Sequence, residues 1–171
     1  NAPITGGNKT ICQGQTIPSL SVSVGTGETV EWFSASTGGT AIATGLSYTP
    51  TVAGTYYAET IQTVNGCRSS SRTGVSLTIN ALPTLTEGTK VCSANLLSYS
   101  VTVTSNGTIT ATAGTVSGTT VTGIPSGTNV TITATSDKGC ESKITVTAPS
   151  CVCPVVNAPI TGGNKTICQG Q

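Results

Sequence analysis

The sequence contains no histidine and very little charge. Asp, Glu, Lys and Arg together make up 8% of the 171 residues, and the formal net charge is +1. The lack of histidine removes the most common general base and the most common metal ligand of proteins. A chain with so few charges lacks the basic surface that nucleic acids or anionic lipids require. We therefore expect no nucleic-acid partner and no direct insertion into a membrane.

Acidic residues are also few and occur singly along the sequence. The six are Glu28, Glu31, Glu59, Glu87, Asp137 and Glu141. No two are adjacent, and this scatter argues against a hydrolase with paired carboxylates, although strands could bring two together. No loop carries the several oxygen ligands that a calcium ion requires. The sequence thus predicts no catalytic residue, no metal site and no cofactor, and we expect that the protein is not an enzyme.

The most informative feature that is present is an internal repeat. Residues 1–15, NAPITGGNKTICQGQ, recur letter for letter at residues 157–171. Fifteen consecutive identities indicate a tandem array with a period of 156 residues. We therefore interpret residues 157–171 as the beginning of the next identical copy. The absence of methionine and of a signal-peptide pattern fits an internal piece of a longer protein.

Each copy divides again into two related modules. Cys12 and Cys92 each follow a proline by nine residues, and each module has a later Gly-Cys pair. The predicted domains are residues 1–80 and residues 81–156, with short proline-bearing links that favour a stiff rod of two domains. Each has the size of a small β-sandwich, for which burial alone provides marginal stability and crosslinks help most.

Alternating apolar and polar residues predict β-strands throughout both modules. Clear examples are Leu20–Val24 and Thr29–Phe33 in the first module, and Tyr99–Val103 and Asn129–Ala134 in the second. Gly and Asn-Gly turns separate the strands at short intervals, and no helical periodicity is present. This pattern predicts an all-β fold of tandem immunoglobulin-like antiparallel β-sandwiches.

The aromatic residues are few, and two of them are core candidates. Trp32 and Phe33 are adjacent in a predicted strand, so one should be buried and the other at least partly exposed. Trp32 is the better core candidate by analogy with the strand-C tryptophan of immunoglobulin domains. Tyr56 and Tyr57 divide in the same way, with Tyr56 in the predicted core. An exposed aromatic ring could stack on a sugar, but a structural role is favoured.

Cysteine is abundant and predicts crosslinks. Each copy holds six cysteines, Cys12, Cys67, Cys92, Cys140, Cys151 and Cys153, while Cys168 repeats Cys12 in the next copy. An even number per copy favours closed disulfides without a spare thiol. It also favours an oxidising compartment, which could be the cell surface, the extracellular medium or a periplasm. Zinc binding by Cys151 and Cys153 is disfavoured because the sequence has no second close pair of cysteines.

The sequence alone leaves the disulfide pairing of these cysteines open. The cysteines occupy similar positions in the two modules, which favours pairing Cys12 with Cys67 and Cys92 with Cys140. Cys151 and Cys153 would then remain, either for a small, strained ring with each other or for bonds elsewhere. The alternative is that cysteines of adjacent modules meet at the joint. In that case Cys168 would complete a bond that begins in the preceding copy.

Several motifs resemble one protein family. The first module resembles the Ig-like and PKD-like modules of giant surface proteins of Bacteroidota, through Thr10–Gly14, Glu31–Phe33, Ala53–Tyr56 and Asn65–Cys67. The second module resembles their usual companion, through Val91-Cys92, Lys138–Cys140 and Ala148–Pro154. The resemblance implies export by the type IX system and, in many members, a gliding-motility adhesin of the SprB kind. The spacing departs from true immunoglobulins, because Cys67 follows Tyr56 by eleven residues.

Two functions follow as hypotheses. The first is a structural repeat unit in the extracellular stalk or filament of a large surface adhesin, whose partners are adjacent copies in the same chain and possible laterally associated copies. The second is a repeat module that itself binds a glycan or a surface partner, with avidity growing along the array. The sequence leaves the ligand of the adhesive tip unknown.

Overall fold

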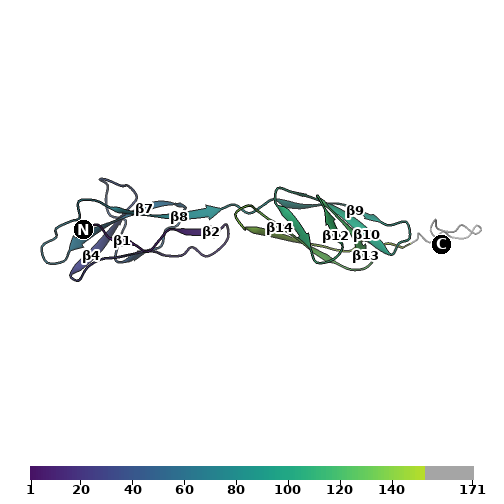
Figure 1. Ribbon diagram of the computed structural model, residues 1–171, viewed down its shortest axis with the longest axis horizontal. Helices are drawn as coiled ribbons and strands as arrows, with labels where there is room; N and C mark the ends of the chain where they lie inside the picture. Colours follow the sequence, from purple (N-terminus) through teal and green to yellow (C-terminus); the bar gives the residue numbers. More distant parts are fainter. Residues whose placement is uncertain (153–171) are drawn as a thin grey trace, which may run out of the picture. The chain divides into compact units, whose positions relative to one another are not determined.

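The structure, a computed structural model, describes residues 1–152. Within this range the chain forms fifteen β-strands and no helix, and none of the described residues belongs to a helix that could cross a membrane. The chain divides into two compact units with the boundary between Ala81 and Leu82 (Figure 1). We call them the first and the second domain. The sequence-based boundary, after residue 80, lies one residue away.

The first domain packs two sheets face to face. Its strands are β1 (Ile4–Thr5), β2 (Lys9–Cys12), β3 (Leu20–Ser23), β4 (Glu28–Phe33), β5 (Ala43–Thr44), β6 (Ser47–Tyr48), β7 (Gly54–Gln62) and β8 (Thr73–Asn80). One sheet has the order β1-β3-β6 and the other β2-β8-β7-β4-β5. All neighbours are antiparallel except β2 and β8, which run parallel. Two layers of short strands make this an immunoglobulin-like sandwich.

The second domain is a sandwich of a slightly different kind. Its strands are β9 (Leu85–Cys92), β10 (Ser98–Ser105), β11 (Thr108–Ala111), β12 (Thr115–Ser117), β13 (Thr120–Pro125), β14 (Val130–Thr135) and β15 (Glu141–Val146). The sheets have the orders β12-β13-β10-β9 and β11-β14-β15, and every pair is antiparallel. This division into four and three strands is that of constant-type immunoglobulin domains. The predicted all-β, immunoglobulin-like fold is confirmed.

The core of the first domain lies between its two sheets and follows from strand alternation. It consists of Leu20, Val22, Val30, Trp32, Tyr56, Ala58, Val75 and Leu77. Trp32 is completely buried and donates its indole N–H to the carbonyl of Gly45 at 2.9 Å. Tyr56 is 8% exposed and donates its hydroxyl to the carbonyl of Val52, four residues upstream, at 3.0 Å. Both predicted core aromatics therefore lie in the core, each with its polar atom satisfied.

Tyr99 has the corresponding role in the core of the second domain. It is buried at the start of β10 among Val101, Val121, Ile124, Val130, Ile132 and Val146. Its hydroxyl donates to the carbonyl of Thr128 at 2.7 Å and so fixes the loop between β13 and β14. Burial raises the pKa of Tyr99, as it raises the pKa of Tyr56, because the charged phenolate would lose its hydration.

The first strands of the two domains differ in how they pair with the sheets, and glycines lie at the positions where they differ. In the first domain the chain leaves one sheet after β1 and joins the other as β2. A Cβ on Gly6 would lie 2.3 Å from Ser21 Oγ, and Gly7 has a φ of +91°, which favours glycine. In the second domain β9 stays with β10 and has a register shift instead. There a Cβ on Gly88 would lie 2.5 Å from Thr102 Oγ1.

The disulfide of the second domain joins the end of β9 to the segment after β15. Cys92 and Cys151 are bonded, with their Cα atoms 5.6 Å apart. The predicted pairing of Cys92 with Cys140 is therefore wrong. The reason is topological: Cys140 lies just before β15, and β9 ends beside the chain that follows β15, where Lys90 Nζ donates to the carbonyl of Thr147.

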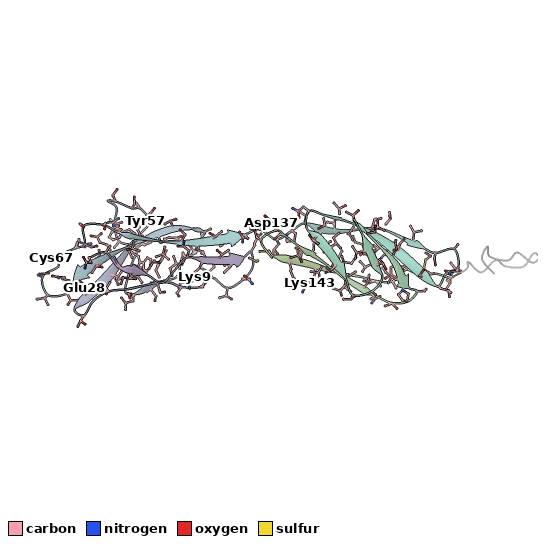
Figure 2. All side chains as sticks on the ribbon, viewed as in Figure 1. Lys9, Glu28, Tyr57, Cys67, Asp137 and Lys143 are labelled. Atoms are coloured by element: carbon pink, nitrogen blue, oxygen red, sulfur yellow. A yellow bond between two sulfur atoms is a disulfide. The ribbon has the colours of Figure 1, made fainter. Side chains whose placement is uncertain are left out.

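The predicted pairing of Cys12 with Cys67 is also wrong. Cys67 is a free, exposed cysteine in the loop between β7 and β8 at one end of the first domain (Figure 2). The expectation that each copy lacks a spare thiol therefore fails for Cys67. Cys12 and Cys140 are both disulfide-bonded. Cys153 and Cys168, which were also predicted to form disulfides, lie outside the described residues.

Candidate functional site

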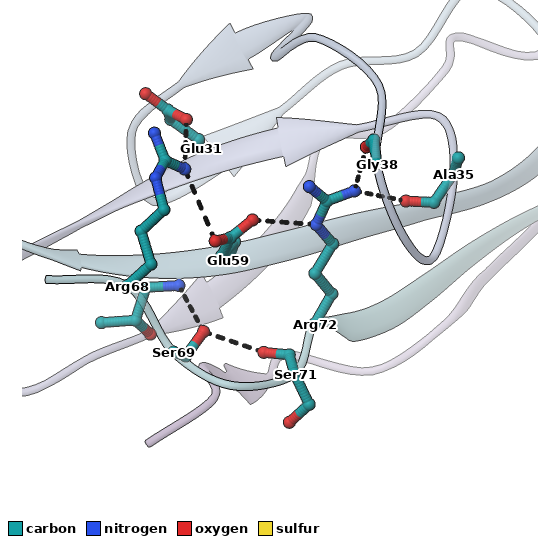
Figure 3. Close-up of polar contacts among 9 residues, drawn as sticks. Glu31, Ala35, Gly38, Glu59, Arg68, Ser69, Ser71 and Arg72 are labelled. Carbon is teal, nitrogen blue, oxygen red and sulfur yellow. Dashed lines mark hydrogen bonds and ion pairs between the residues drawn. The ribbon is translucent and has the colours of Figure 1, made fainter.

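The largest group of interacting charged side chains in the described part of the chain lies on the outer face of the five-stranded sheet. Glu31 on β4 stands directly opposite Glu59 on β7. Trp32 and Ala58 between the sheets alternate with these two glutamates, which therefore point away from the core. Arg68 and Arg72, both from the loop between β7 and β8, lie over them (Figure 3). We call Glu31, Phe33, Glu59, Arg68 and Arg72 the outer-face cluster.

Arg68 bridges the two carboxylates. Its Nη1 lies 2.8 Å from Glu31 Oε2 and 3.5 Å from Glu59 Oε1. Two like charges directly opposite each other on neighbouring strands would destabilise the sheet, and the guanidinium between them offsets this repulsion. The hydrogen bond to Glu31 is the main cause of a raised pKa for Arg68. The side chain of Arg68 nevertheless remains 47% exposed.

Arg72 is more buried and makes more contacts. Its Nε donates to Glu59 Oε2 at 2.9 Å, and its Nη1 donates to the carbonyls of Ala35 and Gly38 at 2.8 Å each. The guanidinium carbon lies 3.3 Å from the centre of the Phe33 ring, a cation–π contact. Arg72 thus ties the loop after β4 to β7 through one planar group that donates in several directions.

The stacking of Arg72 also explains a wrong prediction. Phe33 follows buried Trp32 in β4 and was expected to be at least partly exposed. Phe33 is on the outer face of the sheet, as alternation requires, yet it is only 3% exposed. The long side chain of Arg72 covers the ring, so the residue is buried outside the main core.

Tyr57 lies on the same outer face, next to Phe33 across the strands. A Cβ on Gly74 would lie 3.4 Å from Tyr57 Cε1, so the tyrosine ring covers the glycine of the adjacent strand. An aromatic ring over a glycine compensates for the missing side chain in a sheet. Tyr57 is part-exposed and is the exposed aromatic that sequence alternation anticipated.

An open depression of about 490 Å³ adjoins the outer-face cluster. It is lined by Glu31, Phe33, Gly39, Thr40, Ala41, Glu59, Arg68 and Arg72. Each of its carboxylates already accepts from a guanidinium, and the sequence offers no histidine, so a free general acid or base is missing from this surface. Within residues 1–152, no group of three or more Cys, Asp or Glu side chains could hold a metal ion.

The sequence did not predict the outer-face cluster, although Glu31 and Phe33 lie in the predicted strand Thr29–Phe33. Glu31 and Glu59 are isolated acids in the sequence, since 28 residues separate them. Only the register of β4 with β7 makes them neighbours. A usable signal was the spacing of Glu31 and Phe33, two residues apart on the face opposite Trp32.

One comparison with known protein families agrees with the sandwich fold of the first domain. The family model of the Ig-like domain CHU_C associated matches residues 1–80, all but the last residue of the first domain. Among solved structures, the I-band fragment I67-I69 from titin is similar at 11% sequence identity and a TM-score of 0.39. That similarity covers 84% of this chain and 62% of the titin fragment, so the chain spans less than two thirds of it. None of the curated proteins matches this sequence.

Proposed function

We propose that this chain is a structural repeat unit in the extracellular stalk or filament of a large surface adhesin. The observation that carries the proposal is the exact recurrence of residues 1–15 after one period of two sandwich domains. Identical copies in series add length, whereas a catalytic site gains little from repetition. The partners of each copy are then the adjacent copies of the same chain, with lateral association of chains as a further possibility.

The organisation of the surface supports a structural role. The four charged groups of the outer-face cluster are paired with one another, and Arg72 also binds two backbone carbonyls. These contacts hold loops in place without leaving an unpaired charge for a substrate. The disulfide between Cys92 and Cys151 supports an extracellular location, because such bonds persist in oxidising compartments. Export by the type IX system and a part in gliding motility belong to this proposal.

Small-angle scattering and electron microscopy of chains with several complete copies test the stalk. We expect an extended particle that grows by roughly 70–80 Å per copy, because strands of about seven residues span roughly 23 Å and loops lengthen each domain. The length should increase linearly with the number of copies. A compact particle whose maximum dimension hardly changes from two copies to four contradicts the proposal.

The second candidate is a module that binds a glycan, and the outer face of the first domain favours it. There the part-exposed ring of Tyr57 and the exposed head of Arg68 belong to the same sheet surface. Aromatic faces and guanidinium donors are common in polar recognition. A glycan array probed with a chain of two complete copies distinguishes the candidates. Binding that disappears in both Tyr57→Ala and Arg68→Ala, while the fold is retained, favours the binding module.

A further inference from the structure

Three exposed aliphatic side chains gather at one end of the second domain. We call them the apolar end, and they are Val91, Leu97 and Val152. Each is next in sequence to one of three residues that lie together. Cys92 is bonded to Cys151, whose Sγ is 4.0 Å from the carbonyl oxygen of Ser98. Exposed apolar residues that are scattered singly are ordinary, but several on one surface indicate a contact.

The loop that carries Leu97 is held in a strained conformation. Leu96 has a φ of +60°, the only positive φ outside glycine within residues 1–152. Bulky side chains rarely adopt this conformation, because it costs free energy. The amide of Ser93 donates to the Ser98 carbonyl at 2.9 Å, and the amide of Leu97 donates to Asn95 Oδ1 at 3.1 Å. Leu96 packs against the core of the second domain, while Leu97 remains 72% exposed.

This end of the second domain can be buried without removing an unpaired charge from water. No Asp, Glu, Lys or Arg occurs in the segments that form it, which are residues 93–98, 126–129 and 147–152. The amide of Ser126 donates to the carbonyl of Leu97 at 2.9 Å and so connects two of these segments. Lys90 donates to the Thr147 carbonyl at 3.3 Å and pairs with Glu87 at 2.8 Å, so its charge is compensated. Such a surface favours a packed contact, because burying a charge is costly only where it is unpaired.

The first domain has a groove where the chain enters it. The groove has a volume of about 350 Å³, and its lining includes Asn1, Ala2, Ile4, Val24 and Glu28. Ile4 pairs with Ser23 of β3 and is 72% exposed. The carboxylate of Glu28 accepts from the amide of Gly25 at 2.8 Å. In every copy after the first, the backbone nitrogen of Asn1 belongs to a peptide bond and is uncharged, so the groove can accept an aliphatic partner.

The repeat brings this groove close to the apolar end of the preceding copy. Asn157 is Asn1 of the next copy, and only residues 153–156 lie between it and Val152. Five residue steps span at most about 18 Å, whatever path the chain follows. Asn1 lines the groove and Val152 belongs to the apolar end, so this limit applies to the two surfaces themselves. A tether this short gives an effective concentration of about millimolar, at which a weak apolar contact is populated.

We propose that the apolar end of each copy packs into the groove of the first domain of the following copy, with Leu97 as the central contact. The inference rests on the proposed function, because it requires copies in series. The contact removes aliphatic surface from water on both sides and so stabilises the joint. It also explains why a strained backbone holds Leu97 in solvent when no copy follows. Each joint of the array is then a packed interface between copies.

Methyl NMR spectroscopy of a chain extended to two complete copies tests the docking. We expect a nuclear Overhauser cross-peak between the methyl groups of Leu97 and Ile4 that a single copy lacks. Because the copies are identical, variants in one copy identify which residues touch. Leu97→Ser in the first copy should abolish the cross-peak. The matched control, Leu97→Ser in the second copy, should keep it, since no further copy follows. Ile4→Ser should abolish the cross-peak in the second copy and keep it in the first.

Each other outcome overturns the docking. A folded two-copy chain without the cross-peak has an unpacked joint. A cross-peak that a single copy also shows, or that both Leu97→Ser variants lose equally, comes from a contact within one copy. A cross-peak that weakens on dilution comes from a contact between separate chains. Scattering from the same samples keeps the two proposals apart. An extended particle without the cross-peak overturns the docking alone, and a compact particle overturns the stalk.

Discussion

Replacing Arg72 by alanine is expected to destabilise the first domain by about 3 kcal/mol. The change removes the ion pair with Glu59, two hydrogen bonds to backbone carbonyls and the cover over Phe33. The side chains of Arg72 and Glu59 are both only 11% exposed. Breaking a buried pair costs about 3–5 kcal/mol. The loss of stability at this site should lie at the lower end of that range, because Arg68 remains 3.5 Å from Glu59 and still compensates part of its charge.

Tryptophan fluorescence during urea unfolding measures this effect in the first domain alone. Trp32 is the only tryptophan of the chain and is fully buried in that domain. Urea is preferred to guanidinium chloride because the denaturant itself then adds no ionic screening to the pair. The midpoint should decrease while the slope of the transition stays the same, which identifies a change in stability rather than in the compactness of either state.

Arg68→Ala is the matched control. It removes the same charge from the same loop and also loses a contact with Glu59, but the side chain is 47% exposed. Exposed ion pairs contribute little to stability, so the control should shift the midpoint far less than Arg72→Ala. If the two variants shift it equally, the assignment of Arg72 as the central contact of this surface is refuted.

Three further predictions concern the second domain. Cys92→Ser should lower its stability by about 4 kcal/mol, since the lost bond closes a loop of 59 residues, and calorimetry measures the change. Gly88→Ala should lower its melting temperature by several degrees, because the added Cβ meets Thr102 Oγ1 at 2.5 Å and the Thr102 carbonyl at 2.9 Å. Burial raises the pKa of Tyr99, so the unfolded chain releases this proton first, near pH 10. Stability that is fully present below pH 10 should fall above it, and urea titrations should find a smaller fall in Tyr99→Phe.

The sequence predicted the fold well because strand alternation is a local property. Alternation placed Trp32 and Phe33 on opposite faces, as it did Tyr56 and Tyr57, since adjacent residues in a strand point to opposite sides. The analogy with the strand-C tryptophan of immunoglobulin domains then assigned Trp32 to the core. Prediction was less successful where a distant residue changes the environment. Phe33 obeys the alternation and yet is buried, because Arg72, 39 residues later, stacks on its ring.

The errors in cysteine pairing have a similar origin. The similar positions of Cys12 and Cys92 in their modules suggested similar partners within each module. The disulfide partner of a cysteine instead depends on which strand ends lie close together, and the order of the strands in the sheets determines that. Cys92 ends β9 beside the chain that leaves β15, so it bonds Cys151 although Cys140 is closer in sequence. Nothing in the spacing of the cysteines contains this information.

The parallel pairing of β2 with β8 determines how the first domain responds to being stretched. β2 lies near the beginning of the domain, β8 is its last strand, and both run in the same direction. Tension between the domain's two ends therefore pulls the two strands along their axes in opposite directions. The ladder from Lys9 opposite Leu77 to Cys12 opposite Asn80 is then loaded in shear, so its hydrogen bonds must rupture together. Terminal strands paired antiparallel with their free ends side by side would instead unzip one bond at a time, at lower force.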